Sequence, residues 1–178
     1  MAGEEPIVVS AATLQDWDLL IHCFDASIGY QKINNVNVWM HYDQEVLKKD
    51  ISLGNLYKVT RGGTPGFFFS VTYRDPVIWR EQETGNAIYL HRMVVNPACK
   101  GERLFGEVVR WATKHAADQG RQQIRMDTWA DNTRLIAYYC SFGFRVIEYY
   151  TTPDTSELPV HNRNLSIVLL EMDLKPAY

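Results

Sequence analysis

The sequence predicts an α/β fold with a central, twisted, mixed but mostly antiparallel sheet of about six or seven strands, flanked by about four helices. Two observations lead to this prediction. Short apolar runs of strand length recur along the chain, and several segments between them carry apolar residues at helical spacing. Their order, β-α-α-β-β-β-α-β-α-β-β, distributes helices among the strands, as a mixed sheet with helices on its faces requires.

Length and composition fit one domain over residues 1–178, because a chain of this length typically folds around a single core. Hydrophobic residues make up 46% and charged residues 22%, which argues against the disordered and fibrous classes. No apolar run has a membrane-spanning length, and the acidic start "MAGEEP" does not have the form of a secretory signal. We therefore expect a cytoplasmic protein with no membrane partner.

Charge and cysteine usage narrow the class of partner. The formal net charge is -3 and lysines and arginines do not cluster, so the sequence does not predict nucleic-acid binding and favours a small molecule. Cys23, Cys99 and Cys140 form no CxxC pair, and the histidines show no ligand spacing with cysteines or carboxylates. Neither disulfides nor a metal site is predicted.

The first half of the chain is predicted as a strand, two helices and a hairpin. "PIVVS" is a short apolar strand, and "AATLQDWDLLIHCFDAS" follows with apolar residues at helical spacing. The aromatic stretch "INNVNVWMHY" is irregular, and "DQEVLKKDI" is a shorter helix with Asp43 as its predicted N-cap. "NLYKVT" and "GFFFSVTY" flank the turn residues "RGGTP", which indicates an antiparallel pair.

The second half begins with "AIYLHRMVV", which is apolar on nearly both faces and is predicted to be a central strand. A helix runs from about Leu104 to Gly120. In "QIRMDT", Ile124 and Met126 alternate with Arg125 and Asp127, which predicts a half-covered strand. "DNTRLIAYYCSFGF" is the next helix, residues 151–164 are a surface loop, and "FRVIEYY" and "LSIVLLEMDL" are the last two strands.

The loop "NPACKG" lies between the predicted central strand and the start of the long helix. Unpaired N–H groups at a helix N-terminus favour an anion such as a pyrophosphate, and Lys100 and Arg103 add positive charge. On this loop alone, an ordinary strand-to-helix turn is the preferred interpretation, because such turns are frequent in any α/β fold.

A second block, "MDTWADNTRLIAYYCSFGF", changes this balance. Together, the two blocks resemble the GNAT superfamily of acyl-CoA-dependent N-acyltransferases, whose pattern is a strand ending in V-x-P, a Q/R-x-x-G-x-G/A loop, and an N-x(6)-Y-x-x-x-G-F segment. The matching residues here are Val95 to Pro97, Lys100 with Gly101, Asn132, Tyr139, and Gly143 with Phe144. The resemblance implies acetyl-CoA as cosubstrate, bound by Met93, Val94, Val95, Lys100, Gly101, Glu102, Arg103, Leu104, Phe105, Asn132 and Tyr139.

The loop departs from the family pattern at two positions. Arg103 stands at the usual glycine and Phe105 at the usual glycine or alanine, where the family's backbone closely approaches the pyrophosphate. Either Arg103 pairs with a phosphate, or the loop holds CoA more weakly.

Two residues are the predicted catalytic groups. By alignment to the family, Tyr139 is the acid that protonates the departing CoA sulfur. His91 on the central strand occupies the position of the family's usual glutamate base, and a histidine pKa of roughly 6.5 suits a base near neutrality. For both residues a purely structural role in the core stays open.

The resemblance also implies an acceptor pocket built from the first two helices and the hairpin. Aromatic side chains with a carboxylate, here Asp75 or Glu81, suit an organic cation such as a primary amine, and simple packing of these loop aromatics is the alternative. The predicted substrate-binding residues are Tyr30, Trp39, Tyr73, Trp79 and Trp129.

The sequence therefore predicts an acetyl-CoA-dependent N-acetyltransferase acting on a primary amine of a small molecule, or less readily of a peptide. The resemblance further implies a homodimer formed through the last elements as one arrangement. The alternative is a non-catalytic module that binds acyl-CoA or a metabolite. A dinucleotide-binding fold is set aside, because "PIVVSAATLQDW" has no glycine after the first strand.

Overall fold

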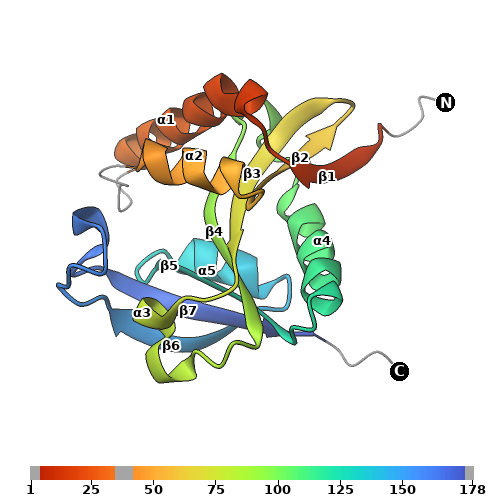
Figure 1. Cartoon of the computed structure of the whole chain (residues 1–178). Coiled ribbons are helices and arrows are strands. Elements are labelled where there is room, and N and C mark those ends of the chain that lie inside the picture. Colours follow the sequence, from red (N-terminus) through yellow and green to blue (C-terminus); the bar gives the residue numbers. More distant parts are fainter. Residues whose placement is uncertain (1–4, 35–41, 175–178) are drawn as a thin grey trace. The chain divides into compact units, whose positions relative to one another are not determined.

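The computed structural model describes residues 5–34 and 42–174 (Figure 1). Their seven strands form one mixed sheet with the order β1-β2-β3-β4-β5-β7-β6. β4 and β5 are parallel, whereas the pairs β1/β2, β2/β3, β5/β7 and β6/β7 are antiparallel. The strands are β1 (Ile7–Ala11), β2 (Leu56–Arg61), β3 (Thr64–Thr72), β4 (Ala87–Val95), β5 (Gln123–Trp129), β6 (Arg145–Thr151) and β7 (Ser166–Asp173).

The helices of the described residues are α1 (Trp17–Ile33), α2 (Gln44–Ser52), α3 (Pro76–Trp79), α4 (Phe105–Asp118) and α5 (Thr133–Cys140). The predicted mixed, mostly antiparallel sheet is confirmed, and so is the order of elements apart from α3. This helix has four residues, too few for an apolar periodicity to appear in the sequence. None of the helices in residues 5–34 and 42–174 has the length and apolar character needed to cross a membrane.

The described residues group into two compact units. Unit 1 comprises Met1–Val71 and Arg92–Trp111, and unit 2 comprises Thr72–His91 and Ala112–Tyr178. β4 and α4 each run from one unit into the other, since the division falls within both elements.

In unit 1, strand alternation decides which helix covers which face of the hairpin. Phe68 points into a cluster with Leu20 and Phe24 of α1 and Leu47 of α2. Its neighbour Phe69 points to the opposite face and contacts Trp111 of α4, with ring centroids 5.3 Å apart. The predicted N-cap of α2 is confirmed, because the Asp43 side chain accepts hydrogen bonds from the N–H groups of Glu45 and Val46.

In unit 2, the core on one face of β4, β5 and β7 combines apolar and charged groups. Trp79 and Tyr89 are fully buried and their rings meet edge to face. The predicted half-covered β5 is wrong at Arg125, which is only 4% exposed. Burial of this cation is possible because its guanidinium donates to the Glu171 carboxylate at 2.7 Å and to the Gln82 carbonyl at 2.8 Å.

Candidate active site

The register between β4 and β5 brings His91 and Asp127 to the same face of unit 2. The two strands pair in parallel from Ala87 opposite Gln123 to Tyr89 opposite Arg125. Side chains two residues apart on a strand point to the same face, so His91 follows Tyr89 and Asp127 follows Arg125. The stacking of the His91 ring with the Tyr89 ring, at 6.3 Å between centroids, supports this placement.

His91 is half-buried, and its Nε2 faces two oxygen atoms. Its Nε2 lies 3.1 Å from the Thr72 hydroxyl and 3.8 Å from Oδ2 of Asp75. The side chain of His91 is 20% exposed and that of Asp75 is 14% exposed, so their charges act through a partly desolvated environment. When Nε2 carries a proton toward these oxygens, Nδ1 is the nitrogen with a lone pair for a substrate proton.

A carboxylate network fixes the segment that presents Asp75. Asp75 stands at the N-cap of α3, but its side chain makes no capping hydrogen bond there. Glu83 holds the backbone instead, because its carboxylate accepts hydrogen bonds from the N–H of Asp75, the N–H of Gly85 and the hydroxyl of Tyr89, each at 2.7 Å. Burial acts to raise the pKa of Glu83, but these hydrogen bonds lower it overall. Glu83 is therefore an anion that orients the turn.

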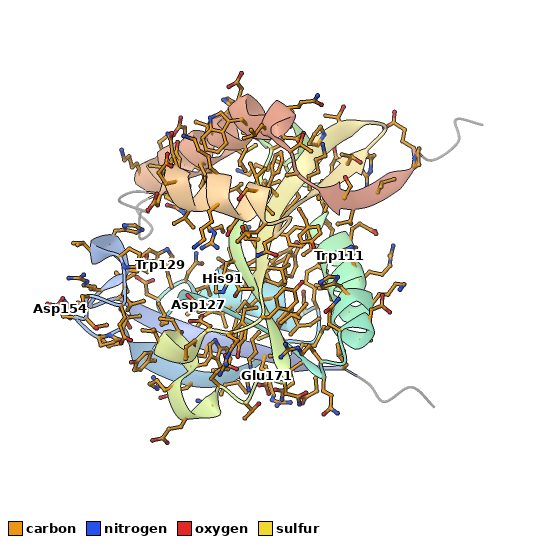
Figure 2. All side chains as sticks on the ribbon, viewed as in Figure 1. His91, Trp111, Asp127, Trp129, Asp154 and Glu171 are labelled. Carbon is orange, nitrogen blue, oxygen red and sulfur yellow. The ribbon has the colours of Figure 1, made fainter. Side chains whose placement is uncertain are left out.

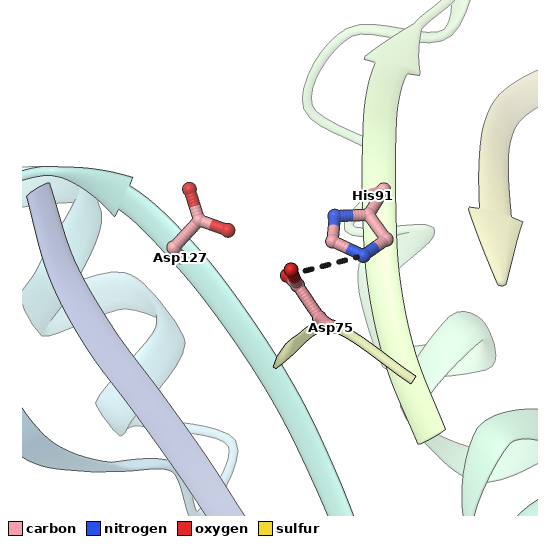
Figure 3. Close-up of side chains that lie close together, drawn as sticks. All are labelled: Asp75, His91 and Asp127. Atoms are coloured by element: carbon pink, nitrogen blue, oxygen red, sulfur yellow. Dashed lines mark ion pairs between the residues drawn. The ribbon is translucent and has the colours of Figure 1, made fainter. Parts of the chain in front are cut away.

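Asp127 completes a cluster with His91 and Asp75. Each of the three side chains offers one nitrogen or oxygen atom, and these atoms lie within 4.8 Å of one another. Figure 3 shows the Asp127 carboxyl group pointing from β5 toward His91 on β4. Burial raises the pKa of Asp127 to about 6, so this carboxyl group changes charge close to neutrality.

Tyr139 lies on α5 in the same unit and is 8% exposed. Burial raises the pKa of its phenol, and the nearby Tyr138 and Asp127 raise it further. The hydroxyl therefore keeps its proton at neutral pH, as a proton donor must. At the start of the helix, Asn132 acts as the N-cap by accepting a hydrogen bond from the Leu135 N–H at 3.1 Å.

The central strand departs from regular strand geometry at Arg92 in unit 1, where φ is 50°. Such a left-handed conformation interrupts the regular alternation of the strand just before Met93, Val94 and Val95. The Arg92 side chain binds the buried Asp50 carboxylate at 2.7 Å. Arg92 thus satisfies a buried charge of unit 1.

The predicted CoA loop of unit 1 has exposed cationic side chains next to two buried apolar side chains. Gly101 adopts φ 93° and a Cβ there would meet no atom within 4 Å. Lys100 lies over the Tyr30 ring at 3.8 Å, and Glu102 forms an ion pair with Arg61. Leu104 and Phe105 are 3% and 2% exposed, so only their backbone groups can serve a ligand.

Arg103 adopts a left-handed backbone conformation, which favours glycine, the residue that the family pattern has here. Its φ is 56°, a left-handed value that costs a residue with a Cβ about 1 kcal/mol. The side chain is exposed, and no ion pair of its guanidinium is recorded within residues 5–34 and 42–174. The exposed guanidinium is compatible with pairing to a phosphate, and both interpretations stay predictions.

Substitutions at Arg103 separate the two interpretations. We expect Arg103→Ala to weaken CoA binding by about tenfold, because a charge-assisted hydrogen bond contributes about 1.5–3 kcal/mol and part of it is lost to solvent screening. Arg103→Gly should weaken binding similarly while relieving the left-handed strain. Titration calorimetry with CoA measures both. Tighter binding by the glycine variant than by the natural protein would show instead that the side chain obstructs the backbone.

The predicted acceptor residues differ in their burial and lie in different units. In unit 2, Trp129 is half-buried at the end of β5 (Figure 2), and the Tyr73 hydroxyl lies 2.9 Å from Nε2 of His115. Trp79 is fully buried in the core of that unit, where it cannot contact a ligand without repacking. In unit 1, Tyr30 is 51% exposed. Trp39 lies outside the described residues.

Sequence reasoning did not predict a role for Asp127. A signal was available in the alternation of the two strands, since Asp127 is two residues after Arg125 and His91 is two residues after Tyr89. Whether the two side chains lie close together depends on the register of β4 with β5, which no local pattern specifies.

Comparisons with known proteins show what the chain is similar to. Residues 67–144 match the model of the Acetyltransferase (GNAT) family. A segment of 70 residues is 30% identical to the uncharacterized N-acetyltransferase YesJ of Bacillus subtilis, and this match covers 39% of either chain. The matched segment thus spans well under half the length of that relative.

Solved structures share the fold over nearly the whole chain. A GNAT family acetyltransferase from Listeria monocytogenes is similar with a TM-score of 0.76 and 18% identity, covering 98% of both chains. A ribosomal-protein-alanine N-acetyltransferase from Brucella melitensis has a TM-score of 0.67 and 16% identity, covering 94% of this chain and 99% of that one. Residues 67–144 of this protein are therefore similar to the GNAT acetyltransferase family, and the chain as a whole has the GNAT fold.

Proposed function

We propose that this protein transfers the acetyl group of acetyl-CoA directly to the primary amine of a small molecule. The observation that carries the proposal is the placement of His91 in unit 2, half-buried and held at Nε2 by Thr72 and Asp75. An imidazole beside a carboxylate is suited to accept a proton, because the carboxylate stabilises the imidazolium that forms. The family match over residues 67–144 supports acetyl transfer as the reaction.

Four roles follow for the residues of the chain. His91 takes a proton from the acceptor, and Tyr139 protonates the CoA sulfur as it leaves. The backbone of Met93, Val94 and Val95 would pair with the pantetheine arm like an added strand. The loop from Lys100 to Phe105 would hold the pyrophosphate through its N–H groups and the Arg103 guanidinium, with Asn132 as a further contact of the arm.

The residues present fit such a cosubstrate. Exposed Lys100 and Arg103 and the open backbone at Gly101 supply cations and N–H groups beside the start of α4. Tyr73 and Trp129 in unit 2 supply aromatic surface for an amine.

Thermal unfolding with CoA and with acetyl-CoA tests the proposal. A ligand that binds only the folded protein at about 100 times its Kd adds about 2.7 kcal/mol, which raises the Tm of a chain of this size by about 5–10 °C. A panel of amines with detection of released thiol then measures turnover. A Tm shift without turnover of any amine would favour the non-catalytic module, and absence of any shift would refute acyl-CoA binding.

A further inference from the structure

The cluster of Asp75, His91 and Asp127 holds more negative charge than a single catalytic base needs. Two carboxyl groups face one imidazole, and the three ligand atoms lie within 4.8 Å of one another. In the part of the chain that the structure describes, no ion pair joins Asp127 to a lysine or an arginine. A bound cation would therefore neutralise the excess negative charge of the cluster.

The two carboxyl groups approach the His91 imidazole from different segments of unit 2. Oδ2 of Asp75 lies 3.8 Å from Nε2 of His91, so its charge favours the imidazolium that forms when the ring accepts a proton. The Glu83 carboxylate fixes the Asp75 backbone, and the Tyr89 ring stacks on the imidazole. Asp127 reaches the same imidazole from β5 (Figure 3), the neighbouring strand.

An anion at the Asp127 position is costly without a partner. Burial raises the pKa of its carboxyl group to about 6, so at neutral pH the carboxylate is held against desolvation. A bound ammonium group would reduce this cost, because a nearby positive charge and a charge-assisted hydrogen bond both favour the ionised acid.

Building on the acetyltransferase proposal above, we propose that Asp127 binds the ammonium group of the acceptor and that Asp75 positions His91 to take a proton from it. The acceptor class is then an aliphatic primary amine, which is protonated at neutral pH. A neutral arylamine brings no charge to Asp127 and gains nothing from it.

Protons and bonds balance in this reaction. The acceptor enters as R–NH3⁺ and gives one proton to His91, which frees the nitrogen lone pair to attack the thioester carbonyl. The C–N bond forms and the C–S bond breaks, while Tyr139 gives its proton to the sulfur and regains one from the amine nitrogen. The third proton stays on the amide. His91 returns its proton to water, so the products are an acetamide, CoA thiol and one proton.

Three variants and one matched control test the proposal. Asp127→Asn and Asp75→Asn keep side-chain volume and remove one charge each, and His91→Gln identifies the His91 resonance. Asp154→Asn removes an equally small carboxylate from the loop of residues 151–164 (Figure 2), where Asp154 is 68% exposed. Because loss of its surface ion pair costs little, this control should behave as the natural protein in every measurement.

The first readout needs no turnover. Imidazole resonances are followed by NMR over pH, and Asp75→Asn and Asp127→Asn should each lower the His91 pKa by about 1, because a nearby carboxylate favours imidazolium. Cyclohexylammonium should shift the His91 resonance saturably in the natural protein and far less in Asp127→Asn. An unchanged His91 titration in both variants, or equal cation binding by Asp127→Asn, would overturn the assignment even if acetylation is observed.

The second readout compares two ring amines, cyclohexylamine, which is protonated at pH 7.5, and aniline, which is neutral. Each amine is compared with itself across variants, so intrinsic nucleophilicity cancels. Asp127→Asn should raise the KM for cyclohexylamine by about 10- to 100-fold and leave that for aniline unchanged. Equal loss on both amines would make Asp127 merely structural. Asp75→Asn should lower kcat for both and move the acidic limb of the pH profile down with the His91 pKa.

The outcomes also separate this inference from the acetyltransferase proposal. Absence of thiol release for every amine, with intact cyclohexylammonium binding at His91, would refute the proposed reaction and keep the cation site. Turnover that is unchanged in Asp127→Asn would support the proposed reaction and refute the cation site. Loss of the natural protein's activity in EDTA, restored by Zn²⁺, would make the cluster a metal site and overturn the amine assignment.

Discussion

Replacing Tyr139 with phenylalanine is expected to lower kcat by about 100-fold and to leave the KM for acetyl-CoA nearly unchanged. The hydroxyl is needed when negative charge develops on sulfur, whereas the ring, which is 8% exposed, packs in the core in both proteins. Steady-state kinetics with thiol detection measures the effect. The Tm should change little, because the phenylalanine ring fills the same space.

Tyr138 provides the matched control for this experiment. It is the adjacent residue on α5, is half-buried, and has its ring centroid 5.8 Å from that of Tyr139. Consecutive residues on a helix differ by about 100° in direction, so Tyr138→Phe should retain turnover. If Tyr139→Phe also retained turnover, Tyr139 would not be the acid.

The pH dependence adds an independent check on Tyr139. Burial, together with Tyr138 and Asp127, raises the pKa of this phenol above its usual value of about 10. An acid of this kind stays protonated throughout the range in which the protein is assayed. Any loss of activity between neutral pH and pH 10 should therefore not come from Tyr139. It should be identical in the natural protein and in Tyr138→Phe.

Replacing Arg125 with methionine is expected to lower the free energy of unfolding by about 3–5 kcal/mol, because Glu171 keeps its buried charge and loses its buried partner. Both side chains are 5% exposed and their ion pair measures 2.7 Å. The guanidinium also donates to the Gln82 carbonyl and the Tyr89 hydroxyl, and it lies over the Trp79 ring. Urea unfolding followed by circular dichroism measures the loss.

Two further variants show whether burial causes this loss. Arg145 also pairs with Glu171 but is 54% exposed, so Arg145→Met should cost less than about 1 kcal/mol. The double variant Arg125→Met with Glu171→Leu removes both buried charges and should regain much of the stability. A loss below about 1 kcal/mol for Arg125→Met alone would show that water reaches the pair.

Regular elements were predictable where a local pattern dictates them. The apolar character of β4 on both faces, the alternation of β3 and the capping residues of α2 and α5 each act within a few residues of sequence. The four-residue α3 was not predicted, because it is too short to show an apolar periodicity. Arg125 was assigned to a half-covered strand because its buried partner Glu171 is 46 residues away.

The same distinction holds for the candidate site. His91, Tyr139 and the loop from Lys100 to Phe105 were identifiable from residue type and spacing, since they lie in contiguous blocks. The positions of Asp75 and Asp127 beside His91 depend on the register of β4 with β5 and on the turn held by Glu83, which the sequence does not reveal. Likewise, the left-handed φ of Arg103 and Arg92 is a property of the folded backbone.

By itself, then, the sequence determined the order of elements, the class of fold and the residues that lie within its two motif blocks, because these depend on short-range periodicity and spacing. Only the tertiary structure decided that two carboxyl groups face His91 and that Arg125 is buried against Glu171. Each of these contacts joins residues distant in the chain, and strand register, which is set by packing of the whole sheet, selects them.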